Sequence, residues 1–223
     1  MEIPGHGVTT GDWDLRKGMQ EYLGGVSYAG QRVLEIGPAS GQVTVELERQ
    51  GAEVVAVEVT DDPGWDFVPY PRSVLQPALA PRRDIMRRLK NSFWFVHKAF
   101  GSSAKMYYGD VYNLPATLGY FDTSVMLSVL LHTRNPLRIL EQCAARSQTV
   151  VITDMFYPEL ENQAVSRLMP TAQNKQWDTW WHFSTKFFTQ FLEVMGFSRF
   201  TITHHTQPWR DKTYPFFTIV AKR

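Results

Sequence analysis

The stretch that decides the fold is Arg32-Val-Leu-Glu-Ile-Gly-Pro-Ala-Ser-Gly41. Its first five residues are typical of a short buried strand, and its last five form a turn bounded by glycines. Val43 and Leu47 follow one helical turn apart, Gly51 ends the predicted helix, and residues 53–57 form a second buried-type strand. Strand, glycine-rich turn, helix and strand in this order predict a βαβ unit, which requires parallel strands and a right-handed crossover.

The same α/β alternation resumes further along the chain. Asn135, followed by a proline, and Ser184 are N-cap residues for two more helices. The last two strands are separated by a short link, which predicts an antiparallel hairpin at the sheet edge. Strand-type runs occupy residues 105–108, 121–127, 149–153, 197–205 and 216–221. We therefore expect an α/β fold with a doubly wound, seven-stranded, mostly parallel sheet.

Two segments interrupt this alternation, and we expect residues 60–104 and 155–183 to be lid insertions in a single domain over residues 1–223. Five prolines between residues 63 and 81 exclude one helix from the first half of the first insertion. Its second half carries an apolar helical stripe at Ile85, Leu89, Phe93, Val96 and Phe100. Before the first strand, residues 12–25 are predicted to be an amphipathic helix, with apolar positions Leu15, Met19, Tyr22 and Leu23.

Composition excludes several classes of protein. The 223 residues carry 23 Lys and Arg against 22 Asp and Glu, so an electrostatic coat for nucleic acid is not expected. The single cysteine, Cys143, excludes an intramolecular disulfide and favours a cytoplasmic location. No apolar run approaches the ~20 residues that span a bilayer, so we expect no membrane segment. Aromatic residues are abundant, at 13% with seven Trp.

The glycine turn predicts a ligand site. A turn between a strand and a helix places backbone N–H groups beside a ligand at the carboxyl end of the sheet. The next strand ends in Glu58, where an acid accepts hydrogen bonds from a ribose diol. Glu35 stands just before the turn and would repel a pyrophosphate, and the glycine spacing is not that of a dinucleotide site. Both features point away from a phosphate ligand, and the acid favours a ligand that carries an amino group or a positive charge.

The segment from Val33 to Gly41, followed by Val54-Val-Ala-Val-Glu58, resembles the nucleotide-binding half of class I S-adenosylmethionine-dependent methyltransferases, a Rossmann-like family. The resemblance implies S-adenosylmethionine as the cofactor. It implies that Glu35 and the glycine turn hold the methionine end of the cofactor, that Glu58 binds the ribose, that Asp110 and Val111 contact the adenine, and that Ser128 lines the pocket. The cofactor-binding residues implied in this way are Glu35, Gly37, Pro38, Ser40, Gly41, Glu58, Val59, Asp110, Val111 and Ser128.

A narrower resemblance concerns the substrate. Leu130-Leu-His-Thr-Arg-Asn-Pro136 and the run from Glu48 to Val54 are similar to a branch related to tRNA wobble-uridine carboxymethyltransferases. That branch also contains small-molecule methyltransferase-like proteins, and this chain lacks the large basic domain expected of the tRNA enzymes. The substrate class therefore does not transfer with the resemblance.

Four residues are candidates for the chemistry itself. His132 follows a predicted strand at the cofactor side and could take a proton from a hydroxyl acceptor, or it could be a structural turn residue. Trp177, Trp181 and His182 lie in the second insertion, where they would wall a substrate pocket, or only attach the insertions to the sheet. The arginines between Arg82 and Arg88 could bind an anionic substrate, or form a solvated helix face. We expect no metal site.

We therefore expect a methyltransferase that transfers a methyl group in line to an O, N or C nucleophile of a small molecule. Two alternatives stay open. One is an RNA-modifying methyltransferase or carboxymethyltransferase of the same fold. The other is a non-catalytic S-adenosylmethionine-binding partner or sensor protein. A homodimer is compatible with either the enzyme or the binder.

Overall fold

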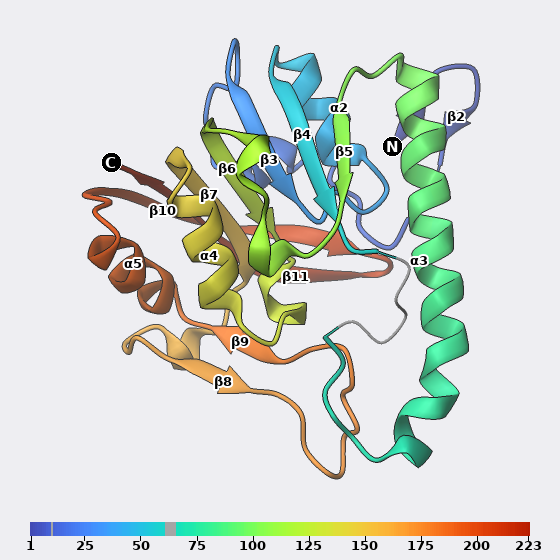
Figure 1. The fold of residues 1–223 in the computed structure, drawn as a ribbon, viewed down its shortest axis with the longest axis vertical. Helices are drawn as coiled ribbons and strands as arrows, with labels where there is room; N and C mark the ends of the chain where they lie inside the picture. Colours follow the sequence, from blue (N-terminus) through green and yellow to red (C-terminus); the bar gives the residue numbers. More distant parts are fainter. Residues whose placement is uncertain (10, 61–65) are drawn as a thin grey trace.

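A computed structural model describes residues 1–9, 11–60 and 66–223, and its centre is one seven-stranded sheet (Figure 1). In spatial order the strands are β10, β11, β7, β6, β3, β4 and β5. Their bounds are β3 (Arg32–Ile36), β4 (Glu53–Glu58), β5 (Lys105–Tyr108), β6 (Phe121–Leu127), β7 (Ser147–Met155), β10 (Arg199–Trp209) and β11 (Lys212–Lys222).

The strand directions confirm the predicted architecture. Strands β3 to β7 are mutually parallel, whereas β11 runs antiparallel to both β7 and β10 and forms the edge hairpin. The chain order reverses around β3, which has β4 on one side and β6 on the other. In open α/β sheets, ligands bind outside the carboxyl ends of the strands at such a switch point.

Helices cover both faces of the sheet, as a doubly wound fold requires (Figure 1). One face carries α4 (Pro136–Ala144) and α5 (Thr185–Val194), and the other carries α2 (Gln42–Arg49) and the short α1 (Met19–Tyr22). Helix α3 (Arg72–Phe100) packs against α2. The predicted N-caps are confirmed: Asn135 Oδ1 accepts a hydrogen bond from Arg138 N at 3.2 Å, and Ser184 Oγ accepts one from Phe187 N at 3.1 Å.

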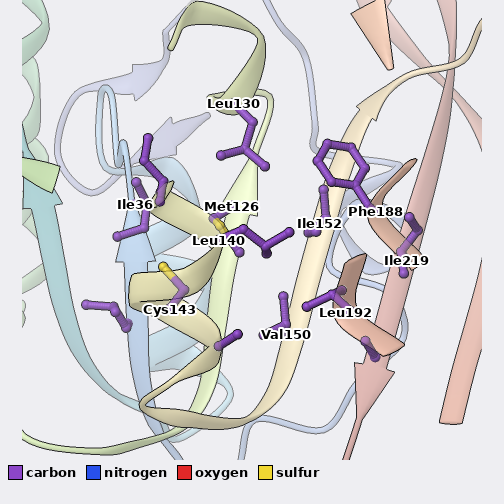
Figure 2. Close-up of a cluster of buried hydrophobic side chains, with 14 of the residues drawn as sticks. Ile36, Met126, Leu130, Leu140, Cys143, Val150, Ile152, Phe188, Leu192 and Ile219 are labelled. Carbon is purple, nitrogen blue, oxygen red and sulfur yellow. The ribbon is translucent and has the colours of Figure 1, made fainter. Parts of the chain in front are cut away.

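The larger core lies between the sheet and the pair α4 and α5. Figure 2 shows side chains that meet there from β3, β6, β7, β11 and both helices. Among them are Ile36, Met126, Leu140, Phe188 and Ile219, each at most 3% exposed. Burying a side chain of this size contributes about 1.5–3 kcal/mol, so this layer stabilises the sheet and holds the carboxyl ends of its strands in place.

The predicted helix over residues 12–25 is wrong in length, because only Met19–Tyr22 is helical. The residues before it run along the C-terminal hairpin instead: Trp13 forms a β-bridge with Trp209, and Asp14 N donates to Pro208 O at 3.1 Å. Gly18 packs tightly against the Gln207 side chain. Local periodicity predicts a helix here, but contacts with a hairpin almost 200 residues away keep this segment extended.

The first insertion is also more helical than predicted. Helix α3 spans 29 residues and includes Pro77 and Pro81, which we expected to exclude a helix. Each proline removes one hydrogen bond to the carbonyl four residues earlier, on Ser73 and Pro77. Both of those residues are exposed, so water can satisfy the freed carbonyl groups. The apolar stripe is shifted as well, because Met86 is buried and Ile85 is 47% exposed.

The second insertion contains a small hairpin that the sequence did not predict. Strands β8 (Ser166–Leu168) and β9 (Trp181–Phe183) pair antiparallel, and β9 packs against the large sheet. The remaining short elements are β1 (Glu2–Ile3), β2 (Gly7–Val8), η1 (Val111–Asn113), η2 (Ala116–Leu118), η3 (Leu130–His132) and η4 (Pro158–Leu160). Among the described residues, no helix has the length and apolar character needed to cross a bilayer.

Candidate active site

The glycine turn lies at the carboxyl end of β3, where the strand order reverses. Gly37 has a left-handed backbone (φ +72°), and a Cβ at this position would lie 2.8 Å from Cγ2 of Val129, in the loop after β6. Gly41 (φ +84°) begins α2, and a Cβ there would lie 3.1 Å from the Phe93 ring of α3. Both positions need glycine, because a left-handed backbone and a close neighbour coincide. Pro38 is buried and Ser40 half-buried between them.

Glu35 lies directly beneath this turn. Its side chain is buried, and Oε2 accepts a 2.6 Å hydrogen bond from Thr44 Oγ1 on α2. Burial raises the pKa of Glu35 to about 7, against the opposing effect of the Thr44 hydroxyl. A buried carboxylate with an elevated pKa is ready to be neutralised by a cationic ligand group.

Glu58 ends the neighbouring strand β4 and is half-buried. One carboxylate oxygen accepts a 2.7 Å hydrogen bond from Val59 N. Burial raises the pKa of Glu58, and the opposing influences are this amide and the charges of Lys90 and Arg82 on α3. The acid therefore lies at the carboxyl edge and faces α3, the position predicted for a ribose-binding residue.

Asp110 and Val111 follow β5 at the same edge. The Asp110 carboxylate caps η1: Oδ1 accepts from Tyr112 N at 2.8 Å and Oδ2 accepts from the Asn113 side-chain amide at 2.7 Å. Val111 is buried beneath it. The carboxylate thus has a structural role as an N-cap, and its contact with an adenine stays a prediction.

Ser128 brings the N-terminal segment to the site. It has a left-handed backbone (φ +53°) directly after β6, and its amide donates to Thr153 O at 2.7 Å. Its hydroxyl shares a 2.8 Å hydrogen bond with the hydroxyl of Tyr22. The residues of α1 therefore lie over the carboxyl ends of β6 and β7.

His132 ends η3, after β6. Its Nδ1 lies 2.6 Å from the backbone oxygen of Asp178, and a carbonyl can only accept, so Nδ1 carries a proton. Desolvation lowers the pKa of His132, assisted by the charge of Arg82 and opposed by Asp178, although part of the ring faces solvent. The neutral ring then has its lone pair on Nε2, which makes that atom able to accept a proton.

The two insertions are joined to each other at this edge. The Trp180 indole donates to the backbone oxygen of Asp66 at 2.6 Å, and Val68 N donates to Trp177 O at 2.9 Å. The Trp177 ring packs on Phe67, with 4.7 Å between ring centroids. Trp181 Nε1 donates to Thr133 O at 3.0 Å, which attaches the second insertion to the loop after β6.

His182 is held by its own neighbours. Its ring stacks on Tyr157 at 3.7 Å, Arg167 donates to Nδ1 at 3.0 Å, and burial lowers the pKa of His182 to about 4. Trp177, Trp181 and His182 therefore each attach one segment to another. Their contribution to a substrate pocket stays a prediction.

Sequence reasoning missed Asp66, which connects three segments. The Asp66 carboxylate accepts from the Tyr112 hydroxyl and, at 2.8 Å, from Arg134 N, while its backbone oxygen holds Trp180. No local pattern marks this residue, because its partners are 46 to 114 positions away along the chain. Within the described part of the chain, no His, Cys, Asp and Glu side chains form a group that could hold a metal ion.

Comparisons with known proteins define the class of fold. No family model and no curated protein matches the chain. Among solved structures is the N-terminal domain of EvdMO1, crystallised in the presence of S-adenosylhomocysteine (SAH) and D-fucose. It is 18% identical to this chain, with a TM-score of 0.57, over 92% of this chain and 79% of that one. The 1,6-didemethyltoxoflavin-N1-methyltransferase of Burkholderia thailandensis, with SAH bound, is 17% identical with a TM-score of 0.57, over 93% and 77%.

A protein of Pyrococcus horikoshii, assigned provisionally as an RNA methyltransferase, has 15% identity and a TM-score of 0.57, over 92% of this chain and 82% of that one. At these identities the likeness establishes the fold. It is the class I fold of S-adenosylmethionine-dependent methyltransferases, as the resemblance of the segments Val33–Gly41 and Val54–Glu58 implied.

Proposed function

We propose that this protein binds S-adenosylmethionine and transfers the methyl group to an O, N or C nucleophile of a small molecule. The observation that carries the proposal is the alignment of the glycine turn, Glu35 and Glu58 at the carboxyl ends of β3 and β4, beside the switch point of the sheet. Solved structures of the same fold contain SAH at 14–18% identity.

The residues present fit this cofactor. Gly37 and Gly41 carry no side chain and have left-handed backbones, so the N–H groups of this turn can approach a ligand closely. Glu35 supplies a buried carboxylate for the ammonium group of the methionine end, and Glu58 supplies acceptors for the ribose hydroxyls. Asp110, Val111 and Ser128 would complete the pocket at the carboxyl ends of β5 and β6.

When bound, the cofactor supplies an electrophilic methyl group on a sulfonium. The chain's own contribution is chiefly to align the nucleophile, which can supply about 7–11 kcal/mol of the barrier reduction. The insertions are joined to each other by the Trp180–Asp66 hydrogen bond, and over a bound substrate they would limit access of water to the reacting atoms. His132 Nε2 would take the proton of a hydroxyl acceptor, because Nδ1 is fixed by Asp178.

Titration calorimetry with S-adenosylmethionine and SAH tests whether the protein binds the cofactor, which both the enzyme and the sensor alternative require. Wild type should bind both, and Glu58→Gln should weaken both about 10–100-fold, the effect expected from losing hydrogen bonds to a charged group. Glu53→Gln, an exposed acid at the other end of the same strand, is the matched control and should change neither affinity. Absence of binding, or equal affinities in Glu58→Gln and wild type, contradicts the proposal.

The arginines of α3 favour a small acceptor over RNA. Arg87 and Arg88 are exposed and pair with Asp84 at 2.6 and 2.5 Å, so the helix face is partly neutralised. Tight binding of RNA needs several phosphate contacts and falls steeply with salt. Product formation that depends strongly on salt would support the RNA alternative. Cofactor binding without turnover on any nucleophile would support a binding partner or sensor.

A further inference from the structure

Asp154, near the end of β7, has a buried carboxylate that the fold leaves half satisfied. The residue is 4% exposed, and Oδ1 accepts a 2.8 Å hydrogen bond from Met155 N. The other oxygen, Oδ2, is buried and has no hydrogen-bond partner among residues 1–9, 11–60 and 66–223. Protonation does not resolve this, because a hydroxyl on Oδ2 would then lack an acceptor. Such a group in a folded protein calls for an explanation.

The carboxylate lies at the edge of the sheet where the proposed cofactor would bind. Thr153, the preceding residue, accepts the hydrogen bond from Ser128 N, so the ends of β6 and β7 are side by side. Strand β3 lies on the other side of β6 and leads into the glycine turn. With neighbouring strands ~4.8 Å apart, the end of β7 is roughly 10 Å from that turn. A group here can reach a molecule bound next to the cofactor.

Among the described residues, no cation offsets the charge of Asp154. Burial raises the pKa of Asp154 to about 7, and the only opposing influence is the amide of Met155. Tyr22 and Tyr157 are the titratable groups influenced by its charge, and the pKa of each is raised in part by Asp154. Tyr22 is hydrogen-bonded to Ser128, and Tyr157 is stacked on His182. Both tyrosines that the charge of Asp154 influences therefore already have other partners.

We propose that Oδ2 of Asp154 binds the methyl acceptor by accepting a hydrogen bond from an N–H or O–H group of that molecule. This inference rests on the proposed function and deepens it, because it specifies the substrate class. The acceptor is a neutral or cationic small molecule with a hydrogen-bond donor near its reacting atom. An acceptor with a carboxylate or phosphate at that place is excluded by charge repulsion. Asp154 is thus a binding residue that determines specificity.

The test uses the full chain loaded with SAH and four flat-ring probes. Phenol and aniline carry a donor, anisole has the ring without a donor, and benzoate is an anion. Ligand-observed saturation-transfer NMR measures binding to wild type, Asp154→Asn, Asp154→Leu and the control Asp211→Asn, an exposed residue in the β10–β11 turn. Wild type and the control should bind phenol and aniline at least tenfold more tightly than anisole and benzoate. Both Asp154 variants should lose this preference, and Asp154→Leu should melt at the same or a higher temperature.

The inference is overturned if wild type binds anisole as well as phenol, or if either Asp154 variant that folds keeps the preference for a donor. Oδ2 is then satisfied by an internal water and not by a substrate. A failure of the proposed function is recognised separately, because wild type would then fail to bind SAH in calorimetry. Binding of SAH with no preference among the four probes leaves the proposed function intact and refutes the role of Asp154.

Discussion

Thr44 Oγ1 donates a 2.6 Å hydrogen bond to Oε2 of Glu35. This bond joins the first turn of α2 to the acidic residue near the end of β3. The hydroxyl is the main group that opposes the effect of burial on the pKa of Glu35, which is raised to about 7. The charge state of the acid beneath the glycine turn therefore depends on one side chain of α2.

The affinity for SAH should rise with pH between 6 and 8. The ionised form of Glu35 attracts the ammonium group of the ligand, and a raised pKa means that this form is lost as the pH falls through about 7. Thr44→Val removes the hydrogen bond to the carboxylate and should shift the rise to higher pH. Thr44→Ser keeps the hydroxyl and is the control. Calorimetry at pH 6, 7 and 8 checks this, and identical profiles for the valine and serine variants would refute it.

Gly37→Ala should cost more stability than Gly30→Ala, although the two glycines have nearly the same backbone (φ +72° and +71°). A left-handed alanine costs about 1–2 kcal/mol at either site. At Gly37 the new Cβ also meets Val129 at 2.8 Å, which adds about 1–3 kcal/mol, whereas nothing lies within 4 Å at Gly30. Urea unfolding measures both. Val129→Ala should recover part of the loss in the Gly37→Ala background but not in the Gly30→Ala background.

Trp180→Phe should loosen the contact between the two insertions. The ring is retained, but the half-buried Asp66 carbonyl loses its 2.6 Å hydrogen bond, which costs about 0.5–1.5 kcal/mol. The control is Trp94→Phe. Trp94 lies on an exposed face of α3 and donates its indole N–H to the Tyr108 hydroxyl of β5, and losing this bond should cost less than about 0.5 kcal/mol. Urea unfolding and limited proteolysis of residues 155–183 are the measurements. Equal stability of the two variants would mean that the bond does not join the insertions.

His132→Asn tests the proton-accepting role of this histidine. The asparagine amide can still donate to Asp178 O, but the atom equivalent to Nε2 is lost. For a hydroxyl acceptor, we expect turnover to fall about 10²–10⁴-fold and the SAH affinity to change less than twofold. Because the pKa of His132 is lowered from 6.5, the wild-type rate at saturating cofactor should be flat from pH 7 to 8 and fall in more acidic solution. Unchanged turnover would leave His132 a structural residue.

The sheet could be predicted because its signals are local. Residues 32–36 and 53–57 are mostly apolar runs, with Gly37 directly after the first and Gly51 shortly before the second, and Asn135 and Ser184 satisfy backbone amides within three residues. Such features depend on neighbouring residues along the chain, so a single sequence contains them. The positions of Glu35 and Glu58 followed from the same reasoning, since the carboxyl ends of adjacent parallel strands meet at one edge of the sheet.

The insertions could not be predicted in this way. Pro77 and Pro81 are compatible with α3 only because the carbonyl groups they leave free lie on exposed residues, and exposure is a property of the folded chain. The helix predicted over residues 12–25 fails because Trp13 pairs with Trp209 of the distant hairpin. In both cases a contact or surface formed by the whole fold overrides local propensity.

The amino-acid sequence by itself determined the seven-stranded α/β architecture and the edge of the sheet at which we propose that a ligand binds, because strand patterns and the glycine turn act over a few residues. Only the tertiary structure decided which side chains complete that edge. The tryptophan-rich insertions are joined through Asp66, and one buried oxygen of Asp154 has no hydrogen-bond partner in the described part of the chain. These relationships involve side chains that are far apart along the chain and adjacent in the folded structure. Hydrogen bonding and burial depend on proximity in space and not on separation along the sequence.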